Sequence, residues 1–475
     1  MVDPSARPRR ARSDVTHNRA HILEAAGRLL SRRPRATMSE VAVEANVSRG
    51  TLYRHFATRG DLLDAINRAA YEGAVASVGE GLLPAGQLAR AVPTPLSVAD
   101  VLNKVPPHLL GDQIVAEAQR IGGVSSAAIY LVDLDGAMLK RLAGPHSFPL
   151  EVPVPFAVGT EIPIEGLPAL QGAIEQHLPG AASSPLLLRG RALGTLVAVG
   201  APADALHDLA YEAAAALVVA GTYTDSLDAA RRVRATSPAA EIQQNLLPPR
   251  VVRTSGAMIA GNVLPGYEIG GDWFDYVENT DRTWVGIADA MGNGTRAAAL
   301  ASVALGAFRS ARHQQLELEE VVELMDRTVR ELGTGNTVTT TIGHWVAPTS
   351  TFSWITCGEL GPIVIGSDGY GETMDPVSVP ALGADGGLGE LTARSRRLQD
   401  GELLLLASDG IIDRASPETG ALTIDGVVRA VREGPFRSAA GALASVEERV
   451  RSLSEDPLED DATIVVLAPV LSPGG

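Results

Sequence analysis

The sequence predicts a multidomain chain of mixed class: an all-α head, an α/β middle segment and a larger α/β body. Three observations lead to this prediction. The chain has 475 residues, enough for about three domains of ordinary size. Apolar residues recur with helical spacing in residues 17–75, whereas short β-type runs alternate with helical stretches further along. Hydrophobic residues make up 45 % of the chain and charged residues 20 %, which is typical of globular proteins.

Composition excludes several classes of protein. The single cysteine, Cys357, rules out an intrachain disulfide framework and a paired-cysteine metal or redox site, and it fits a reducing compartment. The longest apolar runs, such as residues 213–220, are too short to span a membrane. No apolar stretch follows the N-terminal arginines, so we expect no signal peptide. These features predict a cytoplasmic protein without membrane contact.

Charge is distributed unevenly along the chain. The net charge is −16, yet residues 1–60 hold 12 arginines, no lysine and five acidic residues. The remaining 415 residues therefore carry a net charge of −23. A basic head on an acidic body indicates a local site for anions, with nucleic acid the obvious candidate. Residues 1–16 are rich in Arg, Pro and Ser and are expected to form a disordered tail.

Residues 17–75 predict short helices that include a helix-turn-helix. Residues 21–30 place apolar side chains on one helical face. Thr37 and Glu40 have the spacing of a capping box for a helix that ends at Asn46, a residue that tolerates the left-handed conformation. Ser48 would cap a second short helix over residues 49–56. Two short helices joined by a tight turn are the layout of a DNA-binding helix-turn-helix.

The string VAVEANVSRGTLYRHFATRGDLLDAI resembles the DNA-binding domain of tetracycline-repressor-type (TetR) regulators, over about residues 17–70. The resemblance implies that this head binds DNA, and two-fold operators make a homodimer the expected state. Asn46 stands where the family usually has glycine. The alternative is a small helical bundle used for protein contacts. The residues expected to contact DNA are Arg49, Thr51, Tyr53, Arg54, His55 and, at a phosphate, Arg59.

The middle of the chain predicts a sensor-like α/β module. Residues 76–96 contain Gly and Pro with few charges and are interpreted as a linker. In residues 97–226, helices are expected over 98–105, 109–121 and 206–220, and two hairpins over 127–142 and 184–198. This order resembles a GAF domain, a fold that binds small ligands or mediates dimerisation. No histidine or cysteine set marks a ligand here, so the cofactor-binding residues are unknown.

Residues 227–250 predict a helical linker between the middle segment and the body. Ser237 suits an N-cap and Pro238 the first helical position. Ile242 and Leu246 then share one face before the Pro248-Pro249 pair ends the helix. Such a helix either pairs with its copy in a dimer and carries a signal, or is a plain connector.

Residues 251–470 carry four acidic motifs. Asp272 lies in GGDWFD, Asp289 in GIADAMGNG, Asp409 follows the apolar run 403–408, and Asp460 precedes the run 463–467. In three motifs the acid lies at the end of a short apolar strand beside glycine, which lets the backbone approach closely. Carboxylates at strand ends form sites for hard cations such as Mg²⁺ and Mn²⁺, and two such ions can activate water for attack on phosphorus.

The ordered set of motifs resembles the metal-dependent protein phosphatases (PPM), specifically the SpoIIE and RsbU branch. The resemblance covers about residues 238–470 and includes LLPP, YEIGGDWFDY, GIADAMGNG, GELLLLASDGIIDRAS and EDDATIVVL. It implies a β-sandwich flanked by helices, and one-step hydrolysis of phosphoserine or phosphothreonine on a partner such as an anti-sigma factor antagonist. By this resemblance two Mn²⁺ or Mg²⁺ ions bind at the catalytic Asp272 and Asp289, the Ala290 carbonyl, Asp409 and Asp460.

Two positions depart from the family pattern. Asn293 stands where the family often has histidine, and Glu359 lies where it often reads Gly-His-Pro. Asp275 and Asp461 are interpreted as structural or supporting acids. The alternative function is a transcriptional regulator whose phosphatase-like body is a non-catalytic dimerisation or ligand-response domain. The four retained carboxylates favour the interpretation as an enzyme over this non-catalytic alternative.

Overall fold

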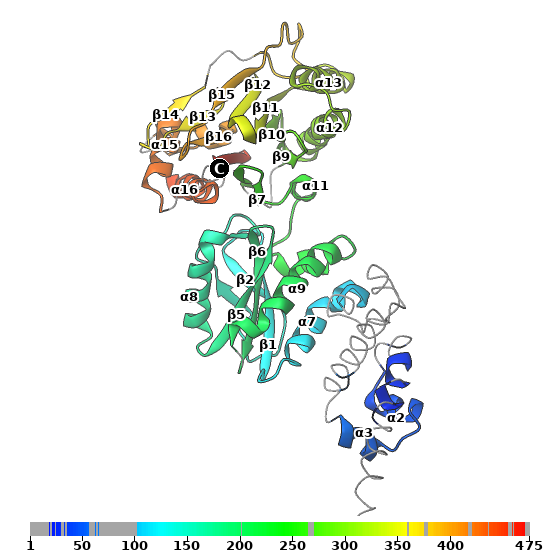
Figure 1. Ribbon diagram of the computed structural model, residues 1–475. Helices are drawn as coiled ribbons and strands as arrows, with labels where there is room; N and C mark the ends of the chain where they lie inside the picture. The colour runs from blue at the N-terminus through cyan, green and yellow to red at the C-terminus, as the bar shows by residue number, and fades with distance from the viewer. Residues whose placement is uncertain are drawn as a thin grey trace, which may run out of the picture. The chain divides into compact units, whose positions relative to one another are not determined.

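The structure is a computed structural model (Figure 1). It describes residues 19, 21–23, 25–29, 33, 36–56, 62, 65, 102–200, 202–264, 270–358, 361–374, 379–416, 420–435, 437–454, 458 and 460–470. The chain divides into two compact units, residues 1–125 with 215–224 and residues 126–214 with 225–475. No helix in these described ranges combines the length and apolar character required to cross a membrane.

The head contains the two predicted helices, α2 (Met38–Glu44) and α3 (Arg49–His55). Thr37 and Glu40 form both arms of the predicted capping box, and the Ser48 hydroxyl accepts a hydrogen bond from the Thr51 amide at 3.1 Å. Asn46 adopts the left-handed conformation with φ of 50°. Leu52 from α3 packs in a core with apolar residues of the helical segments 21–23 and 25–29. The predicted tail 1–16 and linker 76–96 lie outside the described residues.

The middle segment forms one antiparallel sheet. Its order is β3-β2-β1-β6-β4, and β5 also pairs with β6. Both predicted hairpins are confirmed, β1–β2 and β5–β6, the latter turning through Arg189 and Gly190 at positive φ. The strands are β1 (Ser126–Val132), β2 (Met138–Ala143), β3 (Glu151–Pro153), β4 (Ile162–Pro163), β5 (Ala181–Leu188) and β6 (Arg191–Val199).

Three helices belong to the middle of the chain: α7 (Leu110–Ala118), α8 (Leu167–His177) and α9 (His207–Gly221). The predictions over 109–121 and 206–220 are confirmed within a few residues, whereas of 98–105 only 102–104 are described as helical. The sequence analysis missed α8, β3 and β4. Leu170 and Ile174 of α8 pack against Tyr130 and Val132 of β1. The GAF resemblance stays a prediction.

The linker forms two short helices, α10 (Ser226–Arg231) and α11 (Pro238–Leu246). The Ser237 hydroxyl accepts a hydrogen bond from the Ala240 amide at 3.1 Å, as expected of an N-cap before Pro238. Helix α11 packs against α12 and buries Ala239, Ala240 and Gln243. Its buried face thus contacts the body.

The body is a sandwich of two antiparallel sheets, ordered β15-β12-β11-β10-β9 and β14-β13-β16-β19-β8-β7, with a separate short pair β17–β18. Central strands such as β8, β16 and β19 are buried along almost their whole length, because each sheet packs against the other on one face and against helices on its other face. The strands are β7 (Val251–Thr254), β8 (Ala257–Leu264), β9 (Asp272–Glu278), β10 (Thr283–Ala290), β11 (Val338–Val346), β12 (Thr351–Cys357), β13 (Ile363–Ile365), β14 (Gly371–Thr373), β15 (Arg394–Arg397), β16 (Leu403–Ala407), β17 (Ala415–Ser416), β18 (Gly420–Ala421) and β19 (Ala462–Pro469).

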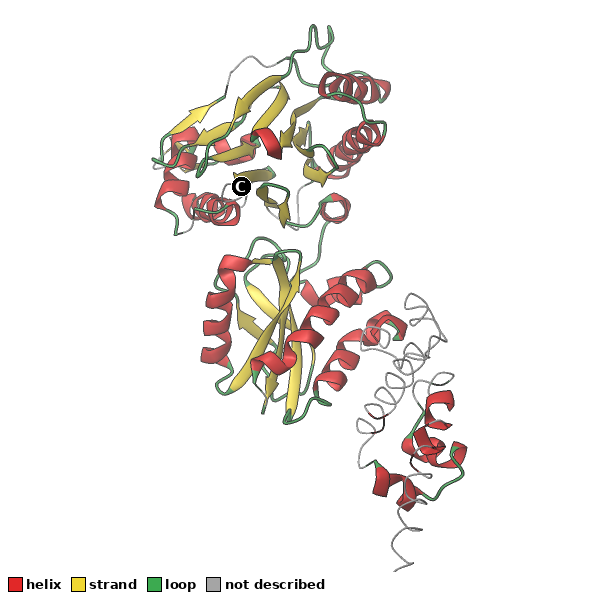
Figure 2. Ribbon diagram, viewed as in Figure 1, coloured by secondary structure: helices red, strands yellow, loops and turns green. Residues whose placement is uncertain are grey.

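Three apolar layers hold the sandwich together. Between the sheets, Phe274 and Trp345 pack with Leu404 and Val465. Outside the five-stranded sheet lie α12 (Gly294–His313) and α13 (Leu318–Glu331), and outside the six-stranded sheet lie α15 (Thr423–Glu433) and α16 (Ala439–Leu453) (Figures 1 and 2). The short helix α14 (Asp409–Ile412) follows β16. The predicted β-sandwich flanked by helices is therefore the architecture of the body.

The capping box at α2 provides a test of the head's stability. Replacing Thr37 with Ala removes one hydroxyl group, which accepts a hydrogen bond from the Glu40 amide and donates one to the Glu40 carboxylate. We expect a loss of about 1 kcal/mol in the local stability of α2, the usual cost of deleting such a cap. Amide hydrogen exchange of residues 38–44 measures it. Thr37→Ser keeps the hydroxyl and should exchange like the wild type; equal exchange in the Ala variant contradicts the role of the cap.

Candidate metal centre

Two of the predicted carboxylates are cross-strand neighbours. Asp272 is the first residue of β9 and Asp289 the next to last of β10, and the antiparallel register places them directly opposite each other. Side chains in such a pair lie about 5 Å apart at Cβ. Asp272 is buried, and its Oδ2 accepts a hydrogen bond from the Thr463 hydroxyl at 2.5 Å. One sheet thus contributes a pair of acids to a single point.

Asp461, which precedes β19, connects the two sheets at this point. Its Oδ2 accepts hydrogen bonds from the amides of Gly271 and Asp272, at 2.8 and 3.1 Å. The same oxygen accepts from the Gln243 amide group on α11 at 2.7 Å. Gln243 also donates to the carbonyl of Asp272 at 3.0 Å. The buried Asp461 carboxylate therefore fixes the start of β9, where Asp272 lies, relative to β19 and the linker helix.

The last two acids lie on adjoining segments, Asp409 in the turn after β16 and Asp460 just before β19. Asp409 opens α14, directly after β16, and both Asp409 and Asp460 are exposed. The Ser408 hydroxyl accepts from the Thr463 amide at 2.9 Å, which joins this turn to β19. A Cβ on Gly410 would lie 2.0 Å from the Asp461 carbonyl oxygen, so only glycine allows the two segments to approach this closely.

Crowding of these acids changes how readily they ionise. Burial raises the pKa of Asp272 well above the usual range of an aspartate, and the charges of Asp289 and Asp461 raise it further. Burial also raises the pKa of Asp289 to about 6, with contributions from Asp409, Asp460 and Asp461. The pKa of Asp461 is raised to about 6, again chiefly by burial. The other four carboxyl groups are therefore close enough to Asp289 to affect its ionisation.

The donor set fits a hard divalent cation. Oδ1 of Asp272 and Oδ1 of Asp461 are buried and have no hydrogen-bond partner among the described residues. A cation would satisfy such oxygens and offset the repulsion between the carboxylates. Gly271 lies against the carbonyl of Ala290, where a Cβ would come within 3.0 Å of its oxygen. No group of three acidic, histidine or cysteine side chains placed to hold a metal ion is present in the described ranges.

Other residues singled out from the sequence lie elsewhere. Asp275 is buried and forms ion pairs with Arg309 and Arg312. Asn293 is the exposed N-cap residue of α12, without a side-chain capping hydrogen bond. Glu359 lies outside the described residues. Burial raises the pKa of the Cys357 thiol to about 12, so its nucleophilic thiolate is scarce near neutral pH.

Sequence reasoning missed several residues that support the acids. Gln243 lies in a linker whose pattern shows only apolar spacing, and nothing there indicates a contact with residues far along the chain. Thr463 occupies a strand position that reads simply as a β-former. The sequence shows only that Asp460 and Asp461 are adjacent acids. The hydrogen bonds of Asp461 to the start of β9 depend on the packing of β19 beside β9, which no local pattern shows.

In the head, the predicted DNA-contacting residues occupy α3. Arg49, Tyr53 and Arg54 are exposed, and Thr51 and His55 are partly exposed. Leu52 on the opposite face is buried. Arg59 lies outside the described residues. The polar side chains of α3 therefore form a surface available to a ligand.

Comparison with known proteins identifies both ends of the chain. Residues 279–469 match the sequence model of stage II sporulation protein E (SpoIIE), and residues 22–66 match that of bacterial regulatory proteins of the tetR family. Phosphoserine phosphatase RsbU of Bacillus subtilis (strain 168) is 22 % identical over 231 residues, which are 48 % of this chain and 68 % of RsbU. The chain is thus similar to tetR-family regulators over one segment and to SpoIIE over another. This confirms the two resemblances that the motifs at each end predicted.

Solved structures that this chain resembles include the SiaA-PP2C domain of Pseudomonas aeruginosa, which is 17 % identical with a TM-score of 0.41. That match covers 48 % of this chain and 94 % of that domain. Another contains the RsbU and RsbW domains of Rv1364c from Mycobacterium tuberculosis, 24 % identical with a TM-score of 0.39 over 46 % and 63 % of the two chains. At these TM-scores the likeness supports no assignment by itself. The enzyme class that the sequence matches support is a metal-dependent protein phosphatase.

The raised pKa values of Asp289 and Asp461 predict how stability depends on pH without metal. Between 3.8, their usual value, and about 6, the folded carboxyl groups hold protons that the unfolded ones have released. The contribution of these two groups to the free energy of unfolding is therefore highest at low pH and is lost as pH rises through about 6. Thermal unfolding in EDTA between about pH 4 and 7, a range that spans the two pKa values, should show this fall.

The double variant Asp289→Asn, Asp461→Asn should show a weaker fall with pH, and Asp400→Asn, at an exposed position, should behave like the wild type. Stabilisation by Mn²⁺ should have the opposite trend and grow with pH, because bound ions require ionised carboxylates. A double variant with an unchanged pH profile would show that these two carboxyl groups are not crowded in the folded chain.

Proposed function

We propose that the body hydrolyses phosphoserine or phosphothreonine on a partner protein, with two Mn²⁺ or Mg²⁺ ions at the acidic cluster. One observation carries this proposal: carboxylates from four distant segments meet where β9, β10, β16 and β19 begin or end. Such mutually repelling acids raise the free energy of the fold unless cations bind between them. The match to the SpoIIE family over residues 279–469 supports the same activity.

Each group in the cluster has a role in this proposal. Asp272, Asp289, Asp409, Asp460 and the Ala290 carbonyl would hold the ions, which when bound supply a nucleophilic water and neutralise charge on the phosphoryl oxygens. Asp461 acts as a positioning residue, because it holds the backbone of Gly271 and Asp272 through two amide hydrogen bonds. The Thr463 hydroxyl orients one oxygen of Asp272 and leaves the other, Oδ1, for a cation.

The proposal also covers the substrate, the middle segment and the assembly. RsbU is named a phosphoserine phosphatase, and we extend this to a phosphoprotein partner of the anti-sigma factor antagonist kind. The sheet of β1–β6 would serve as a GAF-like sensor, connected to the body through α10 and α11. A homodimer would suit a two-fold operator bound by the heads. In the alternative, the body binds ligand or dimerises without hydrolysis; the retained acids argue for the enzyme.

The metal centre can be tested by removing single carboxylates. Asp272→Ala and Asp409→Ala should reduce hydrolysis of a phosphoprotein to background in the presence of Mn²⁺. Mn²⁺ at 100 times its dissociation constant should stabilise the wild type by about 2.7 kcal/mol, since it binds only the folded chain. The Asp272→Ala protein should lose most of that stabilisation, whereas the matched Asp400→Asn variant should keep it along with full activity.

Hydrolysis by Asp272→Ala at the wild-type rate would overturn the assignment, as would the absence of a Mn²⁺-dependent shift in the wild type. Cooperative thermal unfolding of the variant without metal shows that the body, which carries Asp272, is still folded, because DNA binding reports only on the head. Mn²⁺ stabilisation without hydrolysis of any phosphoprotein would favour the non-catalytic alternative.

We further propose that the head binds duplex DNA through α3. The exposed Arg49, Tyr53 and Arg54 lie on one short helix held by the buried Leu52, which is how a recognition helix presents side chains to the major groove. The excess of arginine in residues 1–60 supports contacts with phosphates. The match to the tetR family over residues 22–66 supports this function.

Binding to genomic fragments should weaken steeply as salt rises, because neutralised phosphates release counterions. Replacing both Tyr53 and Arg54 with Ala should weaken binding about tenfold or more, and losing one arginine–phosphate contact should lower the salt slope by about 1. Fluorescence anisotropy across a salt series measures both. Arg429→Ala, on α15 of the body, is the control. Salt-independent binding, or no binding to any fragment, would contradict the proposal.

A further inference from the structure

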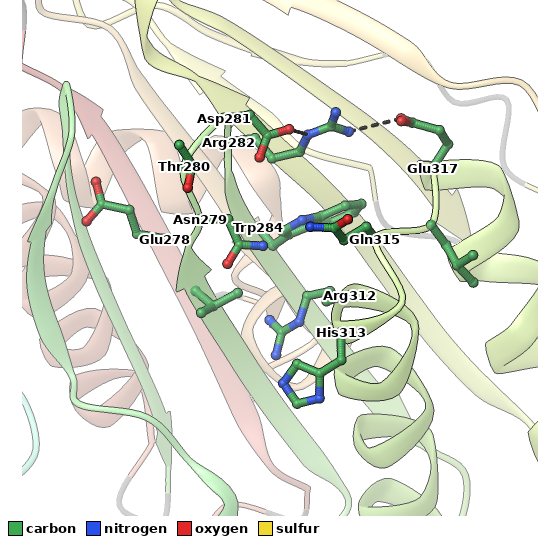
Figure 3. A pocket seen from close by; sticks show the side chains of 12 residues that line it. Glu278, Asn279, Thr280, Asp281, Arg282, Trp284, Arg312, His313, Gln315 and Glu317 are labelled. Carbon is green, nitrogen blue, oxygen red and sulfur yellow. Dashed lines mark hydrogen bonds and ion pairs between the residues drawn. The ribbon is translucent and has the colours of Figure 1, made fainter.

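A pocket of about 1000 Å³ opens at the opposite end of β9 and β10 from the acidic cluster (Figure 3). It is lined by the turn between these strands and by the C-terminal end of α12 with the loop that follows. In Figure 3 the Arg312 side chain extends from α12 toward the strand pair, among the lining side chains and next to His313. Trp284 of β10 contributes a ring to the same lining.

Arg312 is buried in an unbalanced set of charges. Only 7 % of the residue is exposed, and its Nε and Nη1 have no hydrogen-bond partner among the described residues. Its Nη2 donates to Oδ2 of Asp275 at 2.7 Å, and Arg309 binds the same carboxylate at 3.0 and 3.1 Å. Two guanidinium groups thus share one carboxylate, which leaves one positive charge without a counter-ion in the part of the chain that the structure describes. Phe308, whose ring centroid lies 4.2 Å from the Arg312 guanidinium, adds only a cation–π contact.

A buried guanidinium with unpaired N–H groups is costly, because burial removes the water that would otherwise solvate it. Burial accordingly lowers the pKa of Arg312. An anion seated in the pocket would accept from the free N–H groups and complete the charge balance. The fork of a guanidinium matches the geometry of a carboxylate or a phosphate group.

We propose that this pocket binds a small organic anion, a carboxylate or a phosphate monoester, whose anionic group pairs with Arg312. The rim indicates the rest of the ligand. Arg282 already binds Asp281 and Glu317, at 2.6 and 2.9 Å, so its charge is neutralised within the protein. Glu278, Asp281 and Glu317 then give the rim an acidic character, which favours hydroxyl or ammonium groups at the far end of the ligand.

The pocket is distinct from the acidic cluster although it belongs to the same elements. The strand pair has Asp272 opposite Asp289 at one end and Glu278 opposite Thr283 at the other, about 20 Å away at the usual rise of a strand. Helix α12 begins after the Asp289 segment and ends at His313 in the pocket. Binding here therefore needs neither the metal ions nor the proposed hydrolysis.

The test is calorimetric titration of the full chain in EDTA with inorganic phosphate and, separately, with acetate. EDTA leaves the acidic cluster without cations, so the cluster repels both probes. We expect saturable binding of at least one probe. Arg312→Gln should weaken it at least about tenfold, the effect of losing a hydrogen bond to a charged group. The difference between wild type and variant separates the pocket from the basic head.

Matched variants keep the test decisive. Arg327→Gln replaces an exposed arginine on α13, outside the pocket, and should bind like the wild type. Arg312→Lys keeps the charge and should retain part of the affinity. Thr280→Glu adds a negative charge at an exposed position on the rim and should weaken binding even if Arg312→Gln fails to fold. Absence of saturable binding to both probes, or wild-type affinity in folded Arg312→Gln and in Thr280→Glu, would overturn the proposal.

Discussion

Repulsion between carboxylates at one end of the sandwich is the constraint on which the rest of the body depends. Asp272 and Asp289 face each other across two strands, and Asp461 brings a third acid beside them from the other sheet. Each would be better solvated apart. The amides of Gly271 and Asp272, and the Gln243 side chain, hold Asp461 in place by donating to one of its oxygens. Neutral donors fix the acids without cancelling the negative charge that the proposed cations would offset.

The same three elements carry both charged regions of the body. β9, β10 and α12 have the acids near one end and Arg312 at the other. Asp275, within β9, binds Arg312 and also Arg309, and Arg309 donates to the carbonyl of Leu246 at the end of α11 at 2.8 Å. Helix α11 carries Gln243, which touches the acidic cluster. Hydrogen bonds therefore connect the pocket to the acids through the linker helix. Asp275, Arg309 and Gln243 are the residues to change in a test of coupling between the two regions.

Particular residues show how far the sequence could predict this structure. The caps at Thr37, Ser48 and Ser237 depend on neighbours within four residues, and all three form as expected. The hairpins β1–β2 and β5–β6 are likewise local. By contrast, β3 and β4 have only three and two residues and show no periodicity that a pattern could detect. Arg312 belongs to a helix whose amphipathic pattern predicts burial of apolar residues, and the one hydrogen-bond partner of its guanidinium among the described residues, Asp275, lies 37 residues earlier.

In the acidic cluster, sequence motifs predict which acids form the site but not which of them are buried. Each Asp-Gly or Gly-Asp pair is a weak signal alone, because turns favour these residues. Their order over about 190 residues carried the prediction, yet order says nothing of which acid is buried. Burial decides the chemistry: Asp409 and Asp460 are exposed, whereas Asp272 and Asp461 lie in the interior with raised pKa values. In the proposed metal centre the buried acids, which backbone amides and Thr463 hold in place, would define where an ion binds.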